Sequence, residues 1–168
     1  GHLSLLMQWR DDPVTRRFNP LHAVDEATML ARIEREGRPL AERGEGLRWV
    51  VQQGEAVVGS VALKQIEWRH RLAELGMGIA PEHRGRGHAA RAVRLVLALA
   101  FDEAGLERIW ATSHHENVAS HAALLRAGLE REGLLRGHYV IDGRRVDHVV
   151  FGVLRDEWRR LAQRPTES

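Results

Sequence analysis

One turn in the sequence carries the residue types needed to bind an anion. Residues 84–90 read Arg-Gly-Arg-Gly-His-Ala-Ala and follow a short apolar stretch at residues 74–80. Apolar residues at helical spacing after the turn predict that a helix begins here, and the first backbone N–H groups of a helix have no partner within it. Gly85 and Gly87 lack the Cβ atoms that would keep an anion away, and the helix dipole adds attraction. The turn therefore predicts a site for the pyrophosphate of a nucleotide-like cofactor.

The same residues match the dinucleotide-binding pattern G-x-G-x-x-A, which must be weighed as an alternative. That pattern requires its first glycine to follow directly on a strand, at the start of an alternating parallel fold. Here residues 81–84 intervene, and the chain before them has the pattern of antiparallel strands. A P-loop is excluded, because no G-x-x-x-x-G-K-(S/T) sequence occurs and Lys64 is the only lysine. A Rossmann-type NAD-dependent enzyme is thus the less favoured interpretation.

The elements that position this turn are visible in the chain before it. Residues 47–53 and 57–66 have strand-forming composition on either side of a turn at Gly54 and Glu55, which predicts a hairpin. Residues 72–79 supply a third strand, so an antiparallel run leads into the glycine turn. Helices are predicted further upstream at residues 5–13, 25–36 and 40–43, with the first one closed at Pro13.

After the turn, apolar residues at helical spacing over residues 89–100 predict a long helix that Gly105 closes. Residues 108–113 form the next strand, so the strand, helix, strand order makes a crossover between two parallel neighbours. The remaining elements are a helix at 117–127, strands at 130–141 and 146–154, and a tail helix at 155–163. The predicted fold class is α/β: a mixed, mostly antiparallel sheet with one parallel crossover pair and helices on both faces.

The composition limits the classes of function. The 168 residues suit one domain over residues 1–168, of which Gly1 and His2 resemble a tag remnant. The net charge is only +2 and acidic residues alternate with arginines, which argues against nucleic-acid binding. Without cysteine there is no disulfide, thiolate metal site or cysteine nucleophile. The chain has no apolar run of membrane length and no signal sequence, so we expect a cytoplasmic protein with no membrane partner.

Two motifs together resemble a known superfamily. The residues from Arg84 to Ala89 resemble (Q/R)-x-x-G-x-(G/A), the acetyl-CoA signature of the GNAT superfamily of N-acetyltransferases, and they lie between a strand and a helix as that family requires. Asn117 and Ser120, followed by residues 124–129, resemble the family's N-x-x-S…L-x-x-x-G-(F/L) helix. The sequence is most similar to the branch that includes ribosomal-protein N-terminal acetyltransferases. The resemblance covers residues 5–158, although the family's first strand is missing.

The resemblance implies an acetyl-CoA site. Backbone N–H groups of the turn would hold the pyrophosphate, and Arg84 and Arg86 would add charge. Peptide groups of the preceding strand would pair with the pantetheine arm like an extra strand. Gly76 and Gly78 would mark a bulge or a close approach of the backbone, and in the family this bulge aims an N–H at the thioester carbonyl. The implied cofactor residues are Met77, Gly78, Ile79, Arg84, Gly85, Arg86, Gly87, His88, Ala89, Ala90 and Asn117, the last as a cofactor contact or a helix cap.

Acetyl transfer to an amine needs a base, because only the neutral amine attacks the thioester. Glu74, at the start of the strand before the turn, is the first candidate, acting through water. His114 and His115 are the alternatives, and adjacent residues of an extended chain point to different sides, so both are not expected to serve. As a metal site the histidine pair lacks a companion ligand at recognised spacing, and no metal is expected.

The departing CoA thiolate benefits from a proton donor. Many members of the superfamily carry a tyrosine seven residues after the motif asparagine, but here that residue is Leu124, and the only tyrosine is Tyr139. Ser120 matches the serine of the ribosomal-protein branch and is the candidate donor. The function expected is therefore direct transfer of an acetyl group from acetyl-CoA to a primary amine, by a monomer or homodimer. The acceptor is a protein N-terminus or a small amine, and a non-catalytic CoA-binding module is the alternative.

Overall fold

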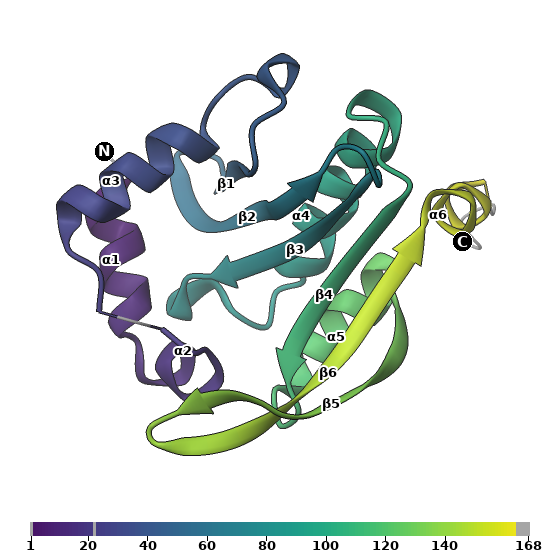
Figure 1. The fold of residues 1–168 in the computed structure, drawn as a ribbon. Coiled ribbons are helices and arrows are strands. Elements are labelled where there is room, and N and C mark those ends of the chain that lie inside the picture. Colours follow the sequence, from purple (N-terminus) through teal and green to yellow (C-terminus); the bar gives the residue numbers. More distant parts are fainter. Residues whose placement is uncertain (1, 22, 164–168) are drawn as a thin grey trace.

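The computed structural model describes residues 2–21 and 23–163, and a single six-stranded sheet organises them (Figure 1). Gly1, half of the expected tag remnant, lies outside these residues, as do residues 164–168. The strand order is β1-β2-β3-β4-β6-β5, and every neighbouring pair is antiparallel except β3 and β4. The strands are β1 (Leu47–Gln53), β2 (Ala56–Glu67), β3 (Leu72–Ile79), β4 (Arg108–His114), β5 (Glu130–Ile141) and β6 (Arg144–Leu154).

The helices largely follow the predicted boundaries, with one difference near the start. Pro13, expected to close the first helix, instead begins a second one, because proline is well suited to a first helical position and the Asp12 side chain accepts a hydrogen bond from the Thr15 N–H. Across the described ranges, no helix is both long and apolar enough to cross a membrane. The α-helices are α1 (Leu3–Asp11), α2 (Pro13–Phe18), α3 (Glu26–Glu36), α4 (His88–Ala98), α5 (Val118–Ala127) and α6 (Arg155–Ala162).

Helices cover both faces of the sheet, and the pattern of burial shows which residues face which helices. Ala73 and Leu75 of β3, and Ile109 and Ala111 of β4, belong to the hydrophobic core that includes Val93 of α4. Because side chains alternate along a strand, the residues between them face the opposite side. Figure 1 shows α4 and α5 together behind the sheet, whereas α1, α2 and α3 lie together on another side of the molecule, at the left of the view.

The parallel pair β3–β4 is short, and the two strands separate beyond it. Their ladder ends where Glu74 pairs with Trp110, after which β3 continues beside β2 and β4 beside β6 (Figure 1). The bulge expected at Gly76 and Gly78 is not there, since both residues pair regularly with β2. The irregularity lies in β2 between Lys64 and Glu67. The opening therefore comes from the divergence of β3 and β4.

Candidate active site

The turn before α4 has the backbone geometry that an anion site requires. Gly85 and Gly87 have φ of 74° and 79°, in the left-handed region that favours glycine. Gly87 is the residue that caps α4, and no side chain caps this helix start in the described structure. A Cβ built on either glycine would meet none of the described atoms within 4 Å. The first N–H groups of α4 thus face space that a bound group can enter.

Two histidines at this turn, one just before it and one within it, have buried ring nitrogens without a hydrogen-bond partner among the described residues. His88 is buried, and its Nε2 has no hydrogen-bond partner among the described residues. The Nδ1 of His83 is also buried without one, and the two ring centroids are 6.2 Å apart. Buried polar atoms are normally satisfied, so unpaired atoms at an open helix start fit a site completed by a ligand. The turn fits the pyrophosphate-bearing cofactor expected from the sequence.

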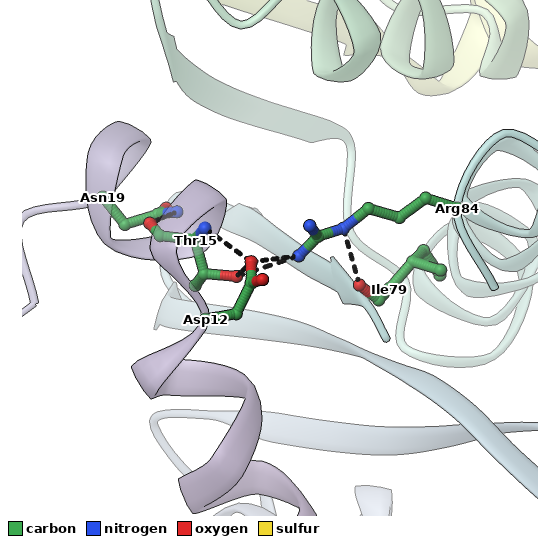
Figure 2. A network of polar contacts seen from close by, with 5 residues as sticks. All are labelled: Asp12, Thr15, Asn19, Ile79 and Arg84. Atoms are coloured by element: carbon green, nitrogen blue, oxygen red, sulfur yellow. Dashed lines mark hydrogen bonds and ion pairs between the residues drawn. The ribbon is translucent and has the colours of Figure 1, made fainter. Parts of the chain in front are cut away.

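Arg84 lies at the same turn, but its guanidinium is bound elsewhere (Figure 2). Its Nη2 donates to Asp12 Oδ2 at 2.7 Å and to Thr15 Oγ1 at 3.0 Å, and its Nε donates to the Ile79 carbonyl at 3.3 Å. Burial acts to raise the pKa of Asp12, but hydrogen bonds from Arg84 and Thr15 outweigh it and lower that pKa. Arg84 therefore ties the turn to the junction of α1 and α2, and its expected charge contribution to a pyrophosphate stays a prediction.

The edge of β3 beyond Glu74 is open to a ligand. β4 has already separated from this edge, so Met77, Gly78 and Ile79 pair with β2 only. Peptide groups that point away from β2 can pair with an extended ligand as they would with another strand. One of the carbonyls, that of Ile79, already accepts the Arg84 hydrogen bond. We call this edge, with residues 84–90, the cofactor side.

Glu74 lies at the point where β3 and β4 separate, on the face opposite α4. Its side chain is 9% exposed, and its Oε1 lies 3.2 Å from Nζ of Lys64, directly across the β2–β3 ladder. Tyr139, from the distant strand β5, also reaches this region, because its phenol lies close enough to Thr112 of β4 and to Glu74 to interact with both. Burial and the nearby Glu74 raise the pKa of Tyr139, so its hydroxyl stays protonated at neutral pH.

A group of histidines continues this face toward α2. His114 is buried at the end of β4, and its ring lies 5.7 Å from His148 of β6 and 5.2 Å from Phe18. The ring of His115 stacks on His114 at 4.7 Å rather than pointing away, since the chain leaves the strand there. Tyr139 packs against His148 at 4.8 Å. Together Glu74, Thr112, His114, Tyr139 and His148 form what we call the acceptor side.

The basicity of these histidines is reduced. Burial lowers the pKa of His148 to about 4, with His114 and His138 adding to the effect. Burial and the neighbouring His115 lower the pKa of His114, and Arg17 of α2 adds a smaller effect. Both rings are therefore neutral at neutral pH. Within the part of the chain that the structure describes, no group of three or more His, Cys, Asp or Glu side chains is placed to hold a metal ion.

The start of α5 provides the remaining candidates. Asn117 caps this helix, because its Oδ1 accepts a hydrogen bond from the Ser120 N–H at 3.2 Å. Ser120 lies in the first turn and is partly exposed. Leu124, which occupies the position of the missing tyrosine, is 1% exposed in the hydrophobic core. Arg94 of α4 donates to the Arg126 carbonyl at the other end of α5 and so holds the two helices together.

Sequence reasoning did not assign a role to Lys64, Thr112, Tyr139 or His148. These residues come from four different strands, and only the sheet order brings them together. The one available signal was compositional, because Tyr139 is the only tyrosine of the chain. The residues predicted for the cofactor side, in contrast, come from one short segment, residues 77–90, with the exception of Asn117 at the start of α5.

A mixed sheet that opens at its parallel strand pair and is followed by a glycine turn and a helix start without a side-chain cap fits a CoA-dependent acyltransferase. A family model described as an acetyltransferase (GNAT) domain matches residues 2–130, and the chain therefore belongs to the GNAT acetyltransferases. It is an acetyl-CoA-dependent N-acetyltransferase. The parallel-sheet arrangement of the Rossmann alternative is wrong, since β1, β2 and β3 are antiparallel.

Similar proteins agree with this assignment. "Uncharacterized N-acetyltransferase YoaA" of Bacillus subtilis is 28% identical over 147 residues, which cover 86% of this chain and 82% of that protein. A B. subtilis relative, YdaF, named as a candidate ribosomal N-acetyltransferase, is 31% identical over 103 residues, 61% of this chain and 56% of its own. The crystal structure of spermidine N-acetyltransferase from Vibrio cholerae with CoA and spermine superposes with a TM-score of 0.83 at 22% identity, covering 95% and 93% of the two chains. The predicted fold is thereby confirmed.

Proposed function

We propose that this acetyltransferase moves the acetyl group directly from acetyl-CoA to a primary amine, which is either a small molecule or a protein N-terminus. The observation that carries the proposal is the β3–β4 opening, which begins just beyond Glu74 and has the glycine turn on one side and the acceptor side on the other. The thioester supplies an activated acyl group, and direct transfer requires that both reactants meet in one opening.

On the cofactor side, most residues bind the cofactor through backbone groups. The N–H groups of Gly85, Arg86, Gly87, His88, Ala89 and Ala90 hold the pyrophosphate at the start of α4. Arg86, which is exposed, adds charge, whereas Arg84 positions the turn through Asp12. Met77, Gly78 and Ile79 pair with the pantetheine arm, and Asn117 keeps the start of α5 beside it.

On the acceptor side, Glu74 takes the proton from the attacking amine, through a water molecule. It is the carboxylate at the mouth of the opening, and Lys64 fixes its orientation at 3.2 Å. His114 is a poorer base because burial lowers its pKa, and His115 is exposed at the outer end of the strand. Ser120 donates a proton to the departing thiolate. It takes the place of the tyrosine that many family members carry, because the residue at that position here is the buried Leu124, which has no hydroxyl.

The names of similar proteins support an amine acceptor of more than one kind. The Vibrio cholerae structure contains spermine, a small amine, whereas YdaF is named for ribosomal substrates. The acceptor to be identified by experiment is therefore either a small amine or a protein N-terminus.

A panel of amines tests the proposal. Free-thiol release from acetyl-CoA is measured with polyamines, amino acids and peptides that have free N-termini, and the acetylated product is confirmed by mass spectrometry. We expect acetyl-CoA-dependent release with at least one class of amine. If CoA binds tightly and no amine in any class is acetylated, the proposed reaction is wrong.

A further inference from the structure

A pocket of about 720 Å³ lies between α2 and the tip of the β5–β6 hairpin, next to the acceptor side. Its volume is in the usual range for small-molecule sites, which is about 300–1,000 Å³. His114 is part of its wall and joins it to the acceptor side, since the ring of His114 lies 5.7 Å from His148. The wall is formed by Pro13, Arg16, Arg17, His114, Ile141, Asp142, Arg144 and Val146.

The wall of this pocket is positively charged. Arg16, Arg17 and Arg144 face it with one carboxylate, that of Asp142. His114 contributes no charge at neutral pH, because its lowered pKa keeps the ring neutral. A polyamine placed here would bring more positive charge beside three guanidinium groups, an arrangement that costs free energy. An anionic group would be attracted instead.

The guanidinium groups of the pocket wall form only weak ion pairs that a ligand can replace. Arg16 pairs with Asp11 at 3.7 Å and Arg17 with Glu116 at 3.3 Å, and all four side chains are more than half exposed. Exposed pairs of this kind contribute little, so a ligand can replace them. Arg144 forms no ion pair with any carboxylate of the described residues. Guanidinium groups bind carboxylates with two parallel hydrogen bonds, which fixes the position of the ligand.

We propose that this pocket holds a carboxylate of the acceptor, so that the enzyme prefers small amines that also carry a carboxylate. This inference rests on the proposed acetyl transfer. Arg17 and Arg144, on opposite walls, bind the carboxylate while the amine extends past His114 toward Glu74. The Vibrio cholerae protein was crystallised with spermine, and on this reasoning the two proteins share a fold but differ in the charge of the acceptor.

Acceptors that differ only in the charge of their far end test the inference. A chain-length series of straight-chain ω-amino acids is compared with the matching carboxamides and diamines. At the best chain length, we expect kcat/KM for the amino acid to exceed that for its carboxamide by about tenfold or more, since hydrogen bonds to a charged group are stronger than those to a neutral one. The diamine should be the poorest acceptor. A higher kcat/KM for the diamine, or equal values for acid and carboxamide, would overturn the inference.

Variants identify the residues responsible. Arg144→Ala and Arg17→Ala should each lower kcat/KM about tenfold for the amino acid and by a much smaller factor for the carboxamide, which bears no charge. Arg136→Ala is the matched control, because Arg136 is an exposed arginine of the same hairpin outside the pocket wall. Acetylation of the carboxamide measures acetyl transfer without the carboxylate. A failure of the proposed acetyl transfer can therefore be distinguished from a failure of the proposed carboxylate site. If no amine is acetylated, calorimetry measures the binding of the amino acid to the CoA-loaded protein instead. If Arg144→Ala does not weaken this binding, the proposed carboxylate site is wrong.

Discussion

The cofactor side and the acceptor side of the opening are built from different kinds of groups. The cofactor side uses the backbone of one continuous segment, with left-handed glycines at residues 85 and 87 and an uncapped helix start. The acceptor side uses side chains from β3, β4, β5 and β6, which include Glu74, Tyr139 and His148. Backbone groups can hold the same cofactor in proteins with different side chains. Side chains on separate strands can change the acceptor without disturbing the cofactor.

If this division is correct, variants on the acceptor side should change turnover and not CoA affinity. The largest effect is expected for Glu74→Gln, which should lower kcat about 100- to 10,000-fold, the usual contribution of a positioned base. CoA affinity, measured by calorimetry, should stay within a few-fold of the wild type. Unchanged kcat would remove Glu74 from the mechanism.

The ion pair with Lys64 requires a control for this variant, because Glu74→Gln leaves the partly buried side chain of Lys64, which is 34% exposed, without its charged partner. The double variant Lys64→Gln, Glu74→Gln replaces both charges. Its melting temperature should recover relative to the single variant, while kcat stays low. Recovery of kcat together with stability would show that the loss came from the unpaired Lys64.

The opposite result is expected on the cofactor side. Gly87→Val places a β-branched residue at φ 79°, at a cost of about 1–2 kcal/mol, and its side chain would cover the N–H groups of α4. CoA affinity should fall about tenfold or more. Gly54→Val is the matched control, because Gly54 also has positive φ and open surroundings but lies in the β1–β2 turn. Equal loss of CoA affinity in both variants would show that strain alone, and not the cofactor site, is responsible.

The same division explains how much the sequence could predict. Hydrophobic periodicity gave the six strands and the parallel crossover, and the glycines before the helix, Gly85 and Gly87, predicted the anion-binding turn. Tyr139 could not be placed, because β5 follows β4 in sequence but is separated from it by β6 in the sheet. Pairing along a strand follows local patterns, whereas contacts across three strands depend on the sheet order and on irregular register such as that between Leu135 and Tyr139.

Tyr139→Phe tests whether the acceptor side extends to β5. The variant keeps the ring against His148 but removes the hydroxyl that lies near Thr112 and Glu74. We expect kcat/KM for the amine to fall several-fold to about tenfold, the effect of one hydrogen bond, with CoA affinity unchanged. Thr112→Val should cause a loss of similar size, and the double variant should lose no more than either single variant. A fully additive double variant would mean that the two hydroxyls act separately.

The smallest effects are expected at the Arg84–Asp12 pair, which ties the cofactor turn to the junction of α1 and α2 (Figure 2). If Arg84 positions the turn, Arg84→Ala and Asp12→Ala should each lower stability and should each weaken CoA binding only a few-fold. Their coupling in a double-mutant cycle should be about 1 kcal/mol, because both side chains are partly exposed. If Arg84 instead binds the pyrophosphate, as its place in the motif suggests, Arg84→Ala should weaken CoA about tenfold or more. Asp12→Ala would then strengthen CoA binding by freeing the guanidinium.

The pH dependence of stability separates these outcomes further. The pKa of Asp12 is lowered in the folded protein, so its contribution is complete above the ordinary carboxylate pKa of about 4 and is lost as the pH falls below it. The difference in melting temperature between the wild type and Asp12→Ala should therefore be constant near neutral pH and shrink at acid pH. In saturating CoA the difference should persist if Arg84 remains bound to Asp12. It should disappear if the cofactor draws Arg84 away, in which case the arginine exchanges Asp12 for the pyrophosphate when CoA binds.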